Sequence, residues 1–360
     1  MSDRPARGIL ANRPLLYGAL LALSVAAPFL FPDYRSTLAL LWVMIVMAMT
    51  WDVLGGQMGY NSFGNIVFFG LGMYTCAIVQ VGLYYDVASY TASGGGKVIT
   101  FTETQFLWGL ALGMLASVVV CVIFAIILGY GILGLRGHYF AICTLGLGIA
   151  MGELFSAWDY VGSGGGMVPP VFPDGLWSRG GFFYYVFFVI AVATFLVLRK
   201  LYRGRFGLAI NAIRDDEDKA EAMGIHTTRY KTFAWVVSAI PLGLMGGGAG
   251  VLIGFIDPVE TAFAGSTYGV WMVLMAILGG KGTLWGPVIG AVIYHVTQEL
   301  FWTYLLGWQR VALGLLIVII VVFFPTGILG WMRERWPERF GVRVEEAEAE
   351  DDAGPGEAAA

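Results

Sequence analysis

Four ionisable residues lie inside strongly apolar segments of the sequence and are its first candidates for chemistry: Asp52, Glu153, His295 and Glu299. Ionisable side chains are costly in apolar surroundings, so they are candidates for function by default. A zinc protease would need the motif HExxH, which the sequence does not contain. The three histidines are scattered along the chain. We therefore expect neither a metal site nor a catalytic residue.

A loop that surrounds the phosphates of ATP needs the pattern GxxxxGK[ST], in which backbone amides contact the phosphate oxygens. Two Gly-Lys pairs occur, but Lys97 is followed by Val98 and Lys281 is followed by Gly282. Neither pair has the required Ser or Thr. The sequence therefore predicts no cofactor and no ATPase site in this chain.

The composition decides the broad class of protein. Hydrophobic residues make up 58% of the 360 residues and charged residues only 13%, against roughly 25% in soluble domains. The mean hydropathy is +0.74. Such a chain lacks the polar surface of a soluble protein, and its apolar content excludes a disordered one. The 51 glycines are typical of closely packed membrane helices. The predicted fold is all-α, a polytopic transmembrane helical bundle.

Segments of about 20 apolar residues predict about ten membrane spans. The first five cover residues 15–31, 37–54, 62–81, 106–133 and 138–158, and the other five cover residues 181–198, 231–255, 267–279, 287–305 and 311–330. The glycines of the third span leave a broken or re-entrant helix open. The eighth span is so short that a partial crossing is an alternative.

Lys and Arg gather in residues 1–14, in the loop at 204–231 and after the last span, whereas the outer loops carry little basic charge. Short cytoplasmic loops are rich in Lys and Arg, so we expect both termini in the cytoplasm and the bundle in the cell (inner) membrane. The domains are then a cytoplasmic arm at 1–14, a transmembrane domain at 15–331 and a charged tail at 332–360. Acidic residues dominate the tail, which is expected to be disordered from about residue 345. No basic patch for nucleic acid appears.

The candidates for a substrate pathway are polar or glycine residues near the ends of the predicted spans: Asn61, Ser62, Asn65, Glu153, Gly164 and Gly165. The first three open the third span, where they either line the pathway or, for Asn61 and Ser62, cap the helix. Glu153 either lines the pathway or contacts water at the outer surface.

The other ionisable residues in the spans have more ordinary interpretations. Asp52 lies near the cytoplasmic end of its span, so its side chain is expected to reach the membrane surface. His295 and Glu299 are four residues apart, which places them on one helix face and favours a structural pair.

Two outer loops are rich in glycine. The loop at residues 82–105 contains Ser-Gly-Gly-Gly at 93–96, and the loop at 159–180 contains it at 163–166, followed by three prolines. Because proline fixes φ and blocks helix, the second loop is expected to be ordered and non-helical or to form a semi-rigid arm. Each loop is either a plain connector or a docking site on the outer face.

The loop at 204–231 has the sequence GRFGLAINAIRDDEDKAEAMGIHTTRYK. It predicts a short amphipathic helix with a sparse apolar stripe of Leu208, Ala212, Ala220 and Met223. Gly224 is well placed to terminate this helix in the left-handed conformation. The segment is either a solvated connector or a helix that docks a cytoplasmic partner.

The run AINAIRDDEDKAEAMGIHTTRYKTFAWVVSAIPLGLMGG at 209–247 resembles the cytoplasmic loop of LivM-type permease subunits of ABC importers for branched-chain amino acids. Three other stretches resemble the same family in the same order: GYNSFGNIVFFGLGMY at 59–74, LRGHYFAICTLG at 135–146 and GGKGTLWGPVIG at 279–290. The resemblance covers about residues 51–325. Two features depart from the family's pattern, because Ile149 stands where an acidic residue is common and the loop around 94–96 is long.

The resemblance implies that the loop at 204–231 carries a coupling helix at about 209–223, which sits in a groove of an ATP-binding subunit. The implied contact residues are Ala212, Arg214, Ala220, Glu221, Met223 and Gly224. It also implies two cytoplasmic ATP-binding subunits, which bind ATP and Mg²⁺, and an extracytoplasmic substrate-binding protein. The sequence shows no internal twofold repeat, so a second homologous permease subunit is expected. The implied substrates are branched-chain or related small amino acids, with amides and urea as alternatives.

Two other classes of function compete with an importer subunit. An ion-coupled secondary transporter needs ion-binding acids near the middle of the membrane, and the sequence has few. An intramembrane enzyme needs a nucleophile with a base or a metal cluster, which the scattered histidines do not supply. The proteins that co-purify with the chain would distinguish an importer subunit from a secondary transporter.

Overall fold

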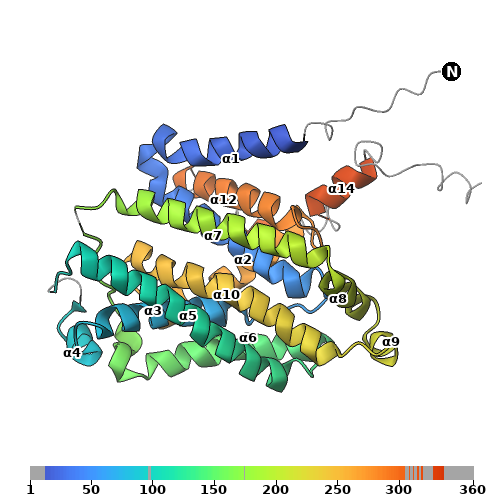
Figure 1. Ribbon diagram of the computed structural model, residues 1–360, viewed down its shortest axis with the longest axis horizontal. Helices are drawn as coiled ribbons and strands as arrows, with labels where there is room; N and C mark the ends of the chain where they lie inside the picture. Colours follow the sequence, from blue (N-terminus) through green and yellow to red (C-terminus); the bar gives the residue numbers. More distant parts are fainter. Residues whose placement is uncertain are drawn as a thin grey trace, which may run out of the picture.

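The computed structural model describes residues 13–95, 99–173, 175–304 and 327–335, together with positions 308, 311, 314, 315 and 318. The helices run roughly side by side in an elongated all-α bundle (Figure 1). The long helices are α1 (Arg13–Leu30), α2 (Arg35–Gly55), α3 (Asn65–Gly82), α5 (Glu103–Ile132), α6 (Gly137–Ser156), α7 (Arg179–Tyr202), α10 (Thr227–Ile253) and α12 (Gly286–Tyr304). The shorter helices are α4 (Val87–Ala92), α8 (Arg205–Asp215), α9 (Glu217–Ala222), α11 (Val270–Gly279) and α14 (Gly327–Arg335).

Among the described residues, seven helical segments are long and apolar enough to cross a membrane: Pro32–Gly55, Asn65–Gly82, Glu103–Ile132, Gly137–Ser156, Arg179–Tyr202, Thr227–Ile253 and Pro258–Gly279. They correspond to predicted spans two to eight. Helices α1 and α12 occupy the first and ninth predicted spans. Most of the tenth predicted span, as well as the N-terminal arm and the tail beyond α14, lies outside the described residues. The count of ten spans therefore stays a prediction.

The third and eighth spans differ from what the sequence suggests. Helix α3 runs without interruption from Asn65 to Gly82, so the broken-helix alternative is wrong for this span. The irregular backbone is confined to residues 56–64, before the helix begins. The eighth span is longer than predicted, because two π-helical turns at Pro258–Ala262 and Gly265–Gly269 precede α11.

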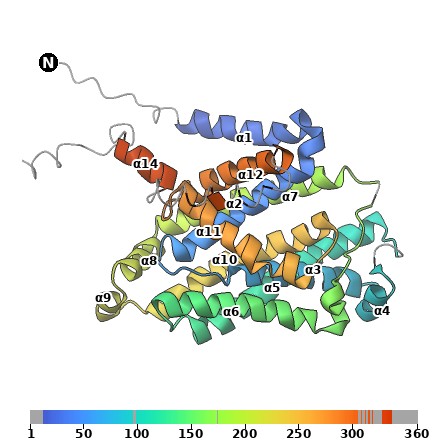
Figure 2. The ribbon, with the colours of Figure 1, turned by 180° about the vertical axis from the view of Figure 1, so that it is seen from behind.

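The centre of the bundle is formed by α3, α5 and α10, and α2 packs between this group and the pair α11 and α12. Figure 2 shows α11 and α12 beside α2 on the far side of the molecule. Glycines allow the backbones of α3 and α10 to touch. A methyl group added to Gly72 would lie 2.4 Å from the carbonyl oxygen of Gly243, and one added to Gly246 would lie 2.1 Å from that of Phe69. The close helix packing expected from the high glycine content is therefore present between α3 and α10.

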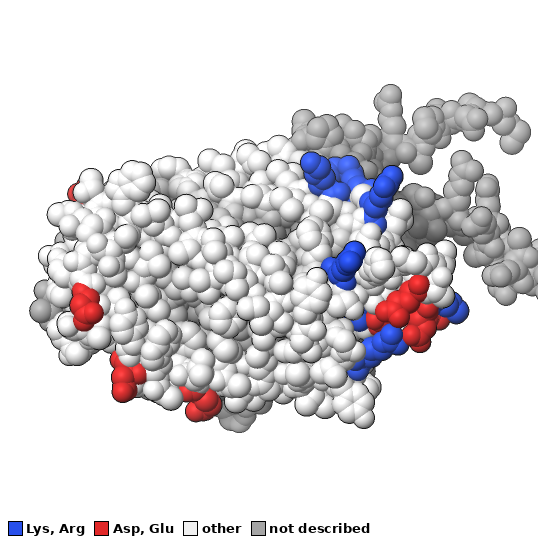
Figure 3. Space-filling model, turned by 60° about the horizontal axis from the view of Figure 1, so that its bottom comes forward, with Lys and Arg blue, Asp and Glu red and all other residues white. Residues whose placement is uncertain are grey.

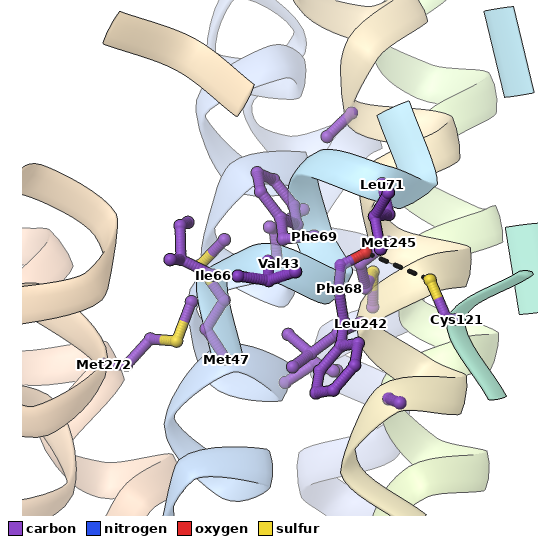
Figure 4. Close-up of a cluster of buried hydrophobic side chains, with 14 of the residues drawn as sticks. Val43, Met47, Ile66, Phe68, Phe69, Leu71, Cys121, Leu242, Met245 and Met272 are labelled. Carbon is purple, nitrogen blue, oxygen red and sulfur yellow. Dashed lines mark hydrogen bonds between the residues drawn. The ribbon is translucent and has the colours of Figure 1, made fainter. Parts of the chain in front are cut away.

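The buried side chains between these helices are almost all apolar. Figure 4 shows side chains of α2, α3, α10 and α11 converging, among them Met47, Phe68, Met245 and Met272. In a lipid environment the driving force for such packing is dispersion and not the removal of apolar surface from water. The Cys121 thiol from α5 adds a hydrogen bond to the carbonyl oxygen of Phe68 at 3.2 Å. Cys76, Cys121 and Cys143 are free thiols.

Charge is distributed unevenly along the long axis of the bundle. Figure 3 shows a broad uncharged surface between the two ends, with Lys and Arg gathered toward one end beside a group of Asp and Glu, and a few separate Asp and Glu toward the other end. Figure 1 places α8, α9, α14 and the start of α1 at a common end, whereas α4 and the glycine-rich outer loops lie at the opposite end. An uncharged belt between two polar ends is the surface expected of a membrane-spanning bundle.

Candidate functional site

The loop at 204–231 folds into two short helices, α8 and α9, instead of the single helix predicted at about 209–223. The break lies at Asp216, whose backbone is extended with φ −164° and ψ 108°. Its carboxylate accepts a hydrogen bond from the amide of Lys219 at 3.0 Å and so caps α9. Aspartate is more favourable at an N-cap than inside a helix, which explains why the prediction of one helix was wrong.

Gly224 terminates α9 as predicted. Its φ of +87° is left-handed, where glycine carries no steric penalty. The Gly224 amide donates to the carbonyl oxygen of Glu221 at 2.9 Å, and the Ile225 amide donates to that of Ala220 at 3.0 Å. These two bonds form a Schellman motif and reverse the chain toward α10.

The predicted contact residues differ in their exposure. Met223 is 83% exposed, and Ala212 is half-buried. Ala220 is only 3% exposed and packs inside the chain, so the prediction that it contacts a partner is wrong. Leu208 belongs to the predicted stripe but not to the predicted contact set, yet it is 74% exposed. The break at Asp216 causes these differences, because it rotates α9 relative to the periodicity of one continuous helix.

The charged contact residues have partners within the chain. Arg214 forms an ion pair with Asp215 at 3.0 Å, and both side chains are exposed. Glu221 accepts a hydrogen bond from the Thr227 hydroxyl at 2.6 Å and lies 3.9 Å from Arg136. Glu221 therefore ties α9 to the first turn of α10.

A cluster of four residues underlies α9, which we call the Lys231 cluster: Lys231, Glu217, Tyr60 and Arg136. Lys231 is 1% exposed and forms an ion pair with Glu217. Its Nζ atom also donates to the phenol oxygen of Tyr60 at 2.9 Å and to the carbonyl oxygen of Leu133 at 3.0 Å. All three protons of the ammonium group therefore have acceptors, as a buried charge requires.

Glu217 is the centre of this cluster. Its second oxygen accepts a hydrogen bond from the Tyr60 hydroxyl, and Arg136 lies 3.4 Å away on the exposed side. Burial opposes ionisation of Glu217, but the hydrogen bonds from Lys231 and Tyr60 hold the pKa of its carboxyl below the ordinary value. Burial, followed by the bond to Glu217, raises the pKa of the Tyr60 phenol above its ordinary value. The cluster thus holds a carboxylate and a neutral phenol at neutral pH.

Sequence reasoning did not find the Lys231 cluster. Its members lie in the α2–α3 connection, the α5–α6 turn, α9 and the start of α10. The available signal was a lysine at the start of an apolar span, where charge is expensive. Lys231 was instead assigned to the basic loop.

Two of the predicted pathway residues belong to a buried polar network. The side-chain oxygen of Asn65 accepts hydrogen bonds from Trp235 and Ser62, each at 3.1 Å, and its amide donates to the carbonyl oxygen of Thr50 at 3.3 Å. Ser62 and Asn65 are fully buried, whereas Asn61 is exposed. Gly64 occupies the N-cap of α3 without a side-chain cap, so the capping alternative for Asn61 and Ser62 is wrong.

The other predicted pathway residues lie toward the end of the bundle opposite α8 and α9. Glu153 is exposed on α6, and Gly164 and Gly165 are exposed in a short 3-10 turn. A methyl group added to either glycine would meet no atom within 4 Å. The structure does not bring these three residues together with Ser62 and Asn65, which lie in the α2–α3 region of the core. The six predicted pathway residues thus form at least two separate groups.

The remaining ionisable residues in the spans differ in their surroundings. Asp52 is fully buried, and its carboxylate accepts a hydrogen bond from the Gly282 amide at 2.7 Å, so the prediction that it reaches the membrane surface is wrong. The turn before α12 supplies that amide directly at the end of α2. His295 is buried, Glu299 is half-buried, and the predicted pair between them is not among the ion pairs of the described residues. Within the same residues, no group of three His, Cys, Asp or Glu could hold a metal ion.

Comparison with known proteins gives the family. The model for "Branched-chain amino acid transport system / permease component" matches residues 34–322. The chain is 27% identical over 354 residues to the high-affinity branched-chain amino acid transport system permease protein LivM of Salmonella typhimurium, and the alignment covers 91% of this chain and 77% of the relative. LivM of Escherichia coli gives the same identity and coverage.

A second relative is LivH of Salmonella typhimurium, a permease protein of the same kind of transport system. It is 33% identical over 147 residues, which cover 39% of this chain and 46% of LivH. No solved structure matches the chain. Because the family model covers most of the sequence and the similarity to LivM extends almost from end to end, the chain belongs to the LivM-type permeases of branched-chain amino acid transport systems.

Proposed function

We propose that this chain is the membrane-spanning subunit of an ABC importer for branched-chain or related small amino acids. Two cytoplasmic ATP-binding subunits bind ATP with Mg²⁺ and hydrolyse it, because this chain has no phosphate-binding motif of its own. A second homologous permease subunit completes the pathway across the inner membrane. An extracytoplasmic binding protein delivers the substrate to the outer loops, where Gly164 and Gly165 are exposed.

The observation that carries this proposal is the α8–α9 element at one end of the bundle. Its far side holds the exposed apolar side chains of Leu208 and Met223 among charged residues, and its near side is tied to the bundle by the Lys231 cluster. Exposed apolar side chains on a charged element suit a protein contact, and such contacts usually centre on a few anchors. The fixed near side suits an element that receives force from a partner.

The orientation follows from the basic residues at the same end. With the α8–α9 end in the cytoplasm, the positive-inside rule is satisfied, and the element faces the compartment that contains ATP. The glycine-rich loops then face outward. This orientation places the proposed ATPase contact and the proposed binding-protein contact at opposite ends of the bundle.

The test is a reconstitution of the chain with its ATP-binding subunits, the second permease and the binding protein. Uptake of labelled leucine is expected to require ATP and to resist ionophores. Met223→Asp and Leu208→Asp are expected to weaken binding of the ATP-binding subunits by about tenfold or more, as for loss of an interface anchor. Met223→Leu is the matched control and is expected to bind normally.

Two results would contradict the proposal. Uptake that follows a proton or sodium gradient without ATP would establish a secondary transporter. If Met223→Asp and Leu208→Asp both bind the ATP-binding subunits normally, the contact with those subunits does not lie on α8 and α9. Uptake of urea or amides in place of leucine would leave the transporter class intact and correct the substrate.

A further inference from the structure

Lys231 joins four parts of the chain that lie far apart in the sequence. Its own backbone lies in the second turn of α10, and its ammonium group contacts Glu217 of α9, Tyr60 of the α2–α3 connection and the carbonyl oxygen of Leu133 at the end of α5. The phenol ring of Tyr60 also lies 4.5 Å below the ammonium nitrogen. A movement of α9 therefore cannot leave the other three segments in place without breaking a buried ionic contact.

One route from this cluster leads into the core through Tyr60. The Tyr60 amide donates to the carbonyl oxygen of Leu54 at 2.8 Å, and its ring packs edge-on against Phe140 of α6 at 5.3 Å. The same connection is tied to α2 a second time, because the Trp51 indole of α2 donates to the carbonyl oxygen of Ser62 at 2.8 Å. Tyr60 is thus held by α2 and α6 on one side and by α9 on the other.

A second route leads along α10 itself. Trp235 lies one turn after Lys231, and its indole donates to Asn65 at the start of α3. The ring of Trp235 also packs edge-on against Phe68 at 5.4 Å. Both routes end at the start of α3, where the backbone is irregular before the helix begins. The start of α3 is therefore the common end point of both connections.

We propose that the Lys231 cluster is the joint that passes movement of α9 to α3 and α10, with Lys231 as the positioning residue that holds α9 to the bundle. This proposal rests on the proposed function, because it assumes that an ATP-binding subunit moves α9. It assigns different tasks to the two sides of the element. The exposed side chains of Leu208 and Met223 bind the partner, and the buried ion pair transmits the motion.

The test compares two lysines of the same loop region in the reconstituted importer. Lys231→Met removes the buried ammonium group and keeps the length of the side chain. Lys219→Met is the matched control, because Lys219 is exposed and its ion pair within the described part of the chain is with Asp216 at 2.9 Å. Three quantities are measured for each variant: binding of the ATP-binding subunits, ATP hydrolysed and leucine accumulated.

Lys231→Met is expected to bind the ATP-binding subunits within about twofold of the wild type, because the exposed side of α8 and α9 is unchanged. The leucine accumulated per ATP is expected to fall about tenfold or more, within the range typical of coupling between sites. Lys219→Met is expected to leave all three quantities unchanged. Lys231→Arg keeps the charge and is expected to restore part of the ratio.

Tyr60→Phe provides a milder variant if Lys231→Met fails to fold. It removes only the hydroxyl between Lys231 and Glu217 and keeps the packing against Phe140. If the cluster acts as a joint, Tyr60→Phe is expected to lower the leucine accumulated per ATP while the ATP-binding subunits stay bound. If a folded variant accumulates as much leucine per ATP as the wild type, the cluster stabilises the fold but does not transmit motion. Loss of subunit binding would overturn the joint as well, whereas a wild-type chain that binds no ATP-binding subunit would overturn the proposed function.

Discussion

The indole nitrogen of Trp235 in α10 donates a hydrogen bond to the side-chain oxygen of Asn65 in α3 across 3.1 Å. The amide group of Asn65 is also bonded to Ser62 and Thr50, so its polar atoms are occupied inside the protein. A side chain with its hydrogen bonds already made gains little from a substrate. Asn65 therefore holds α3 against α10, and we expect its role to be structural.

This relationship predicts the effect of Trp235→Phe. The variant leaves the Asn65 oxygen with one fewer donor in a buried site and is expected to cost about 1–3 kcal/mol of unfolding free energy. The KM for leucine uptake is expected to stay unchanged. Thermal unfolding in detergent and uptake kinetics measure the two effects. Asn61→Ala is the control, since Asn61 is exposed and the change is expected to cost less than about 0.5 kcal/mol. A raised KM with normal stability would return Asn65 to the substrate pathway.

The low pKa of Glu217 predicts a pH dependence of stability. A carboxyl whose pKa is lower in the folded state stabilises the fold above its unfolded pKa of about 4.3 and loses this contribution as the pH falls through the folded value. The wild type is therefore expected to be more stable than Glu217→Gln at pH 7, and the difference is expected to shrink below about pH 4. Unfolding temperatures of both proteins across this range measure it.

The same ion pair predicts an unequal response to single and double substitution. Lys231→Met or Glu217→Gln alone leaves one member of a buried pair without its main partner, which typically costs about 3–5 kcal/mol. The double variant Lys231→Met/Glu217→Gln removes both charges and is expected to recover much of this loss. If the unfolding free energy lost in the double variant equals the sum of the two single losses, the two side chains do not interact.

Gly224 predicts a local effect on the end of α9. No atom lies within 4 Å of a methyl group added there, so a substitution meets only the cost of the left-handed backbone. Gly224→Val is expected to cost about 1–2 kcal/mol and to lower the leucine accumulated per ATP. Gly224→Asn is the control, because asparagine tolerates this conformation. Equal transport ratios in both variants would show that the turn need not be left-handed for coupling.

The outer loop predicts a separation of uptake from assembly. Leucine at position 164 or 165 points into open space, so the fold is expected to form and the ATP-binding subunits to bind. Uptake is expected to fall because a bulky side chain would obstruct the binding protein. Gly162→Leu is a contrasting variant, because a methyl group there would lie 2.2 Å from the carbonyl oxygen of Gly166 and the turn would have to distort. Normal uptake with Gly164→Leu would make the loop a plain connector.

Features that depend on neighbours in the sequence could be predicted. The apolar segments predicted the transmembrane helices, because each needs only its own run of apolar residues. Gly224 could be placed as a helix terminator for the same reason, since the left-handed turn depends on one residue. The high glycine content predicted close helix packing but not which helices would pack together. Asp216 carried a readable capping signal, but the apolar stripe was given more weight.

Features that depend on the path of the chain could not be predicted. Lys231 and Glu217 belong to different helices and meet only because the chain reverses at Gly224. Asp52 and Gly282 are 230 residues apart, and no local pattern relates a carboxylate to a distant backbone amide. The exposure of Ala220 was mispredicted because it depended on the angle between α8 and α9. Each of these contacts is set by tertiary structure.

The bond between Asp52 and Gly282 also has a consequence for biosynthesis. Helix α2 emerges from the ribosome long before the turn that supplies the Gly282 amide. The nascent chain therefore carries the Asp52 carboxylate at the end of an apolar helix without its final hydrogen-bond donor. Until α11 and α12 arrive, water or another polar group must solvate that oxygen. The early helices can therefore insert but cannot close around Asp52. The last part of the chain to be synthesised completes the packing of one of the first helices.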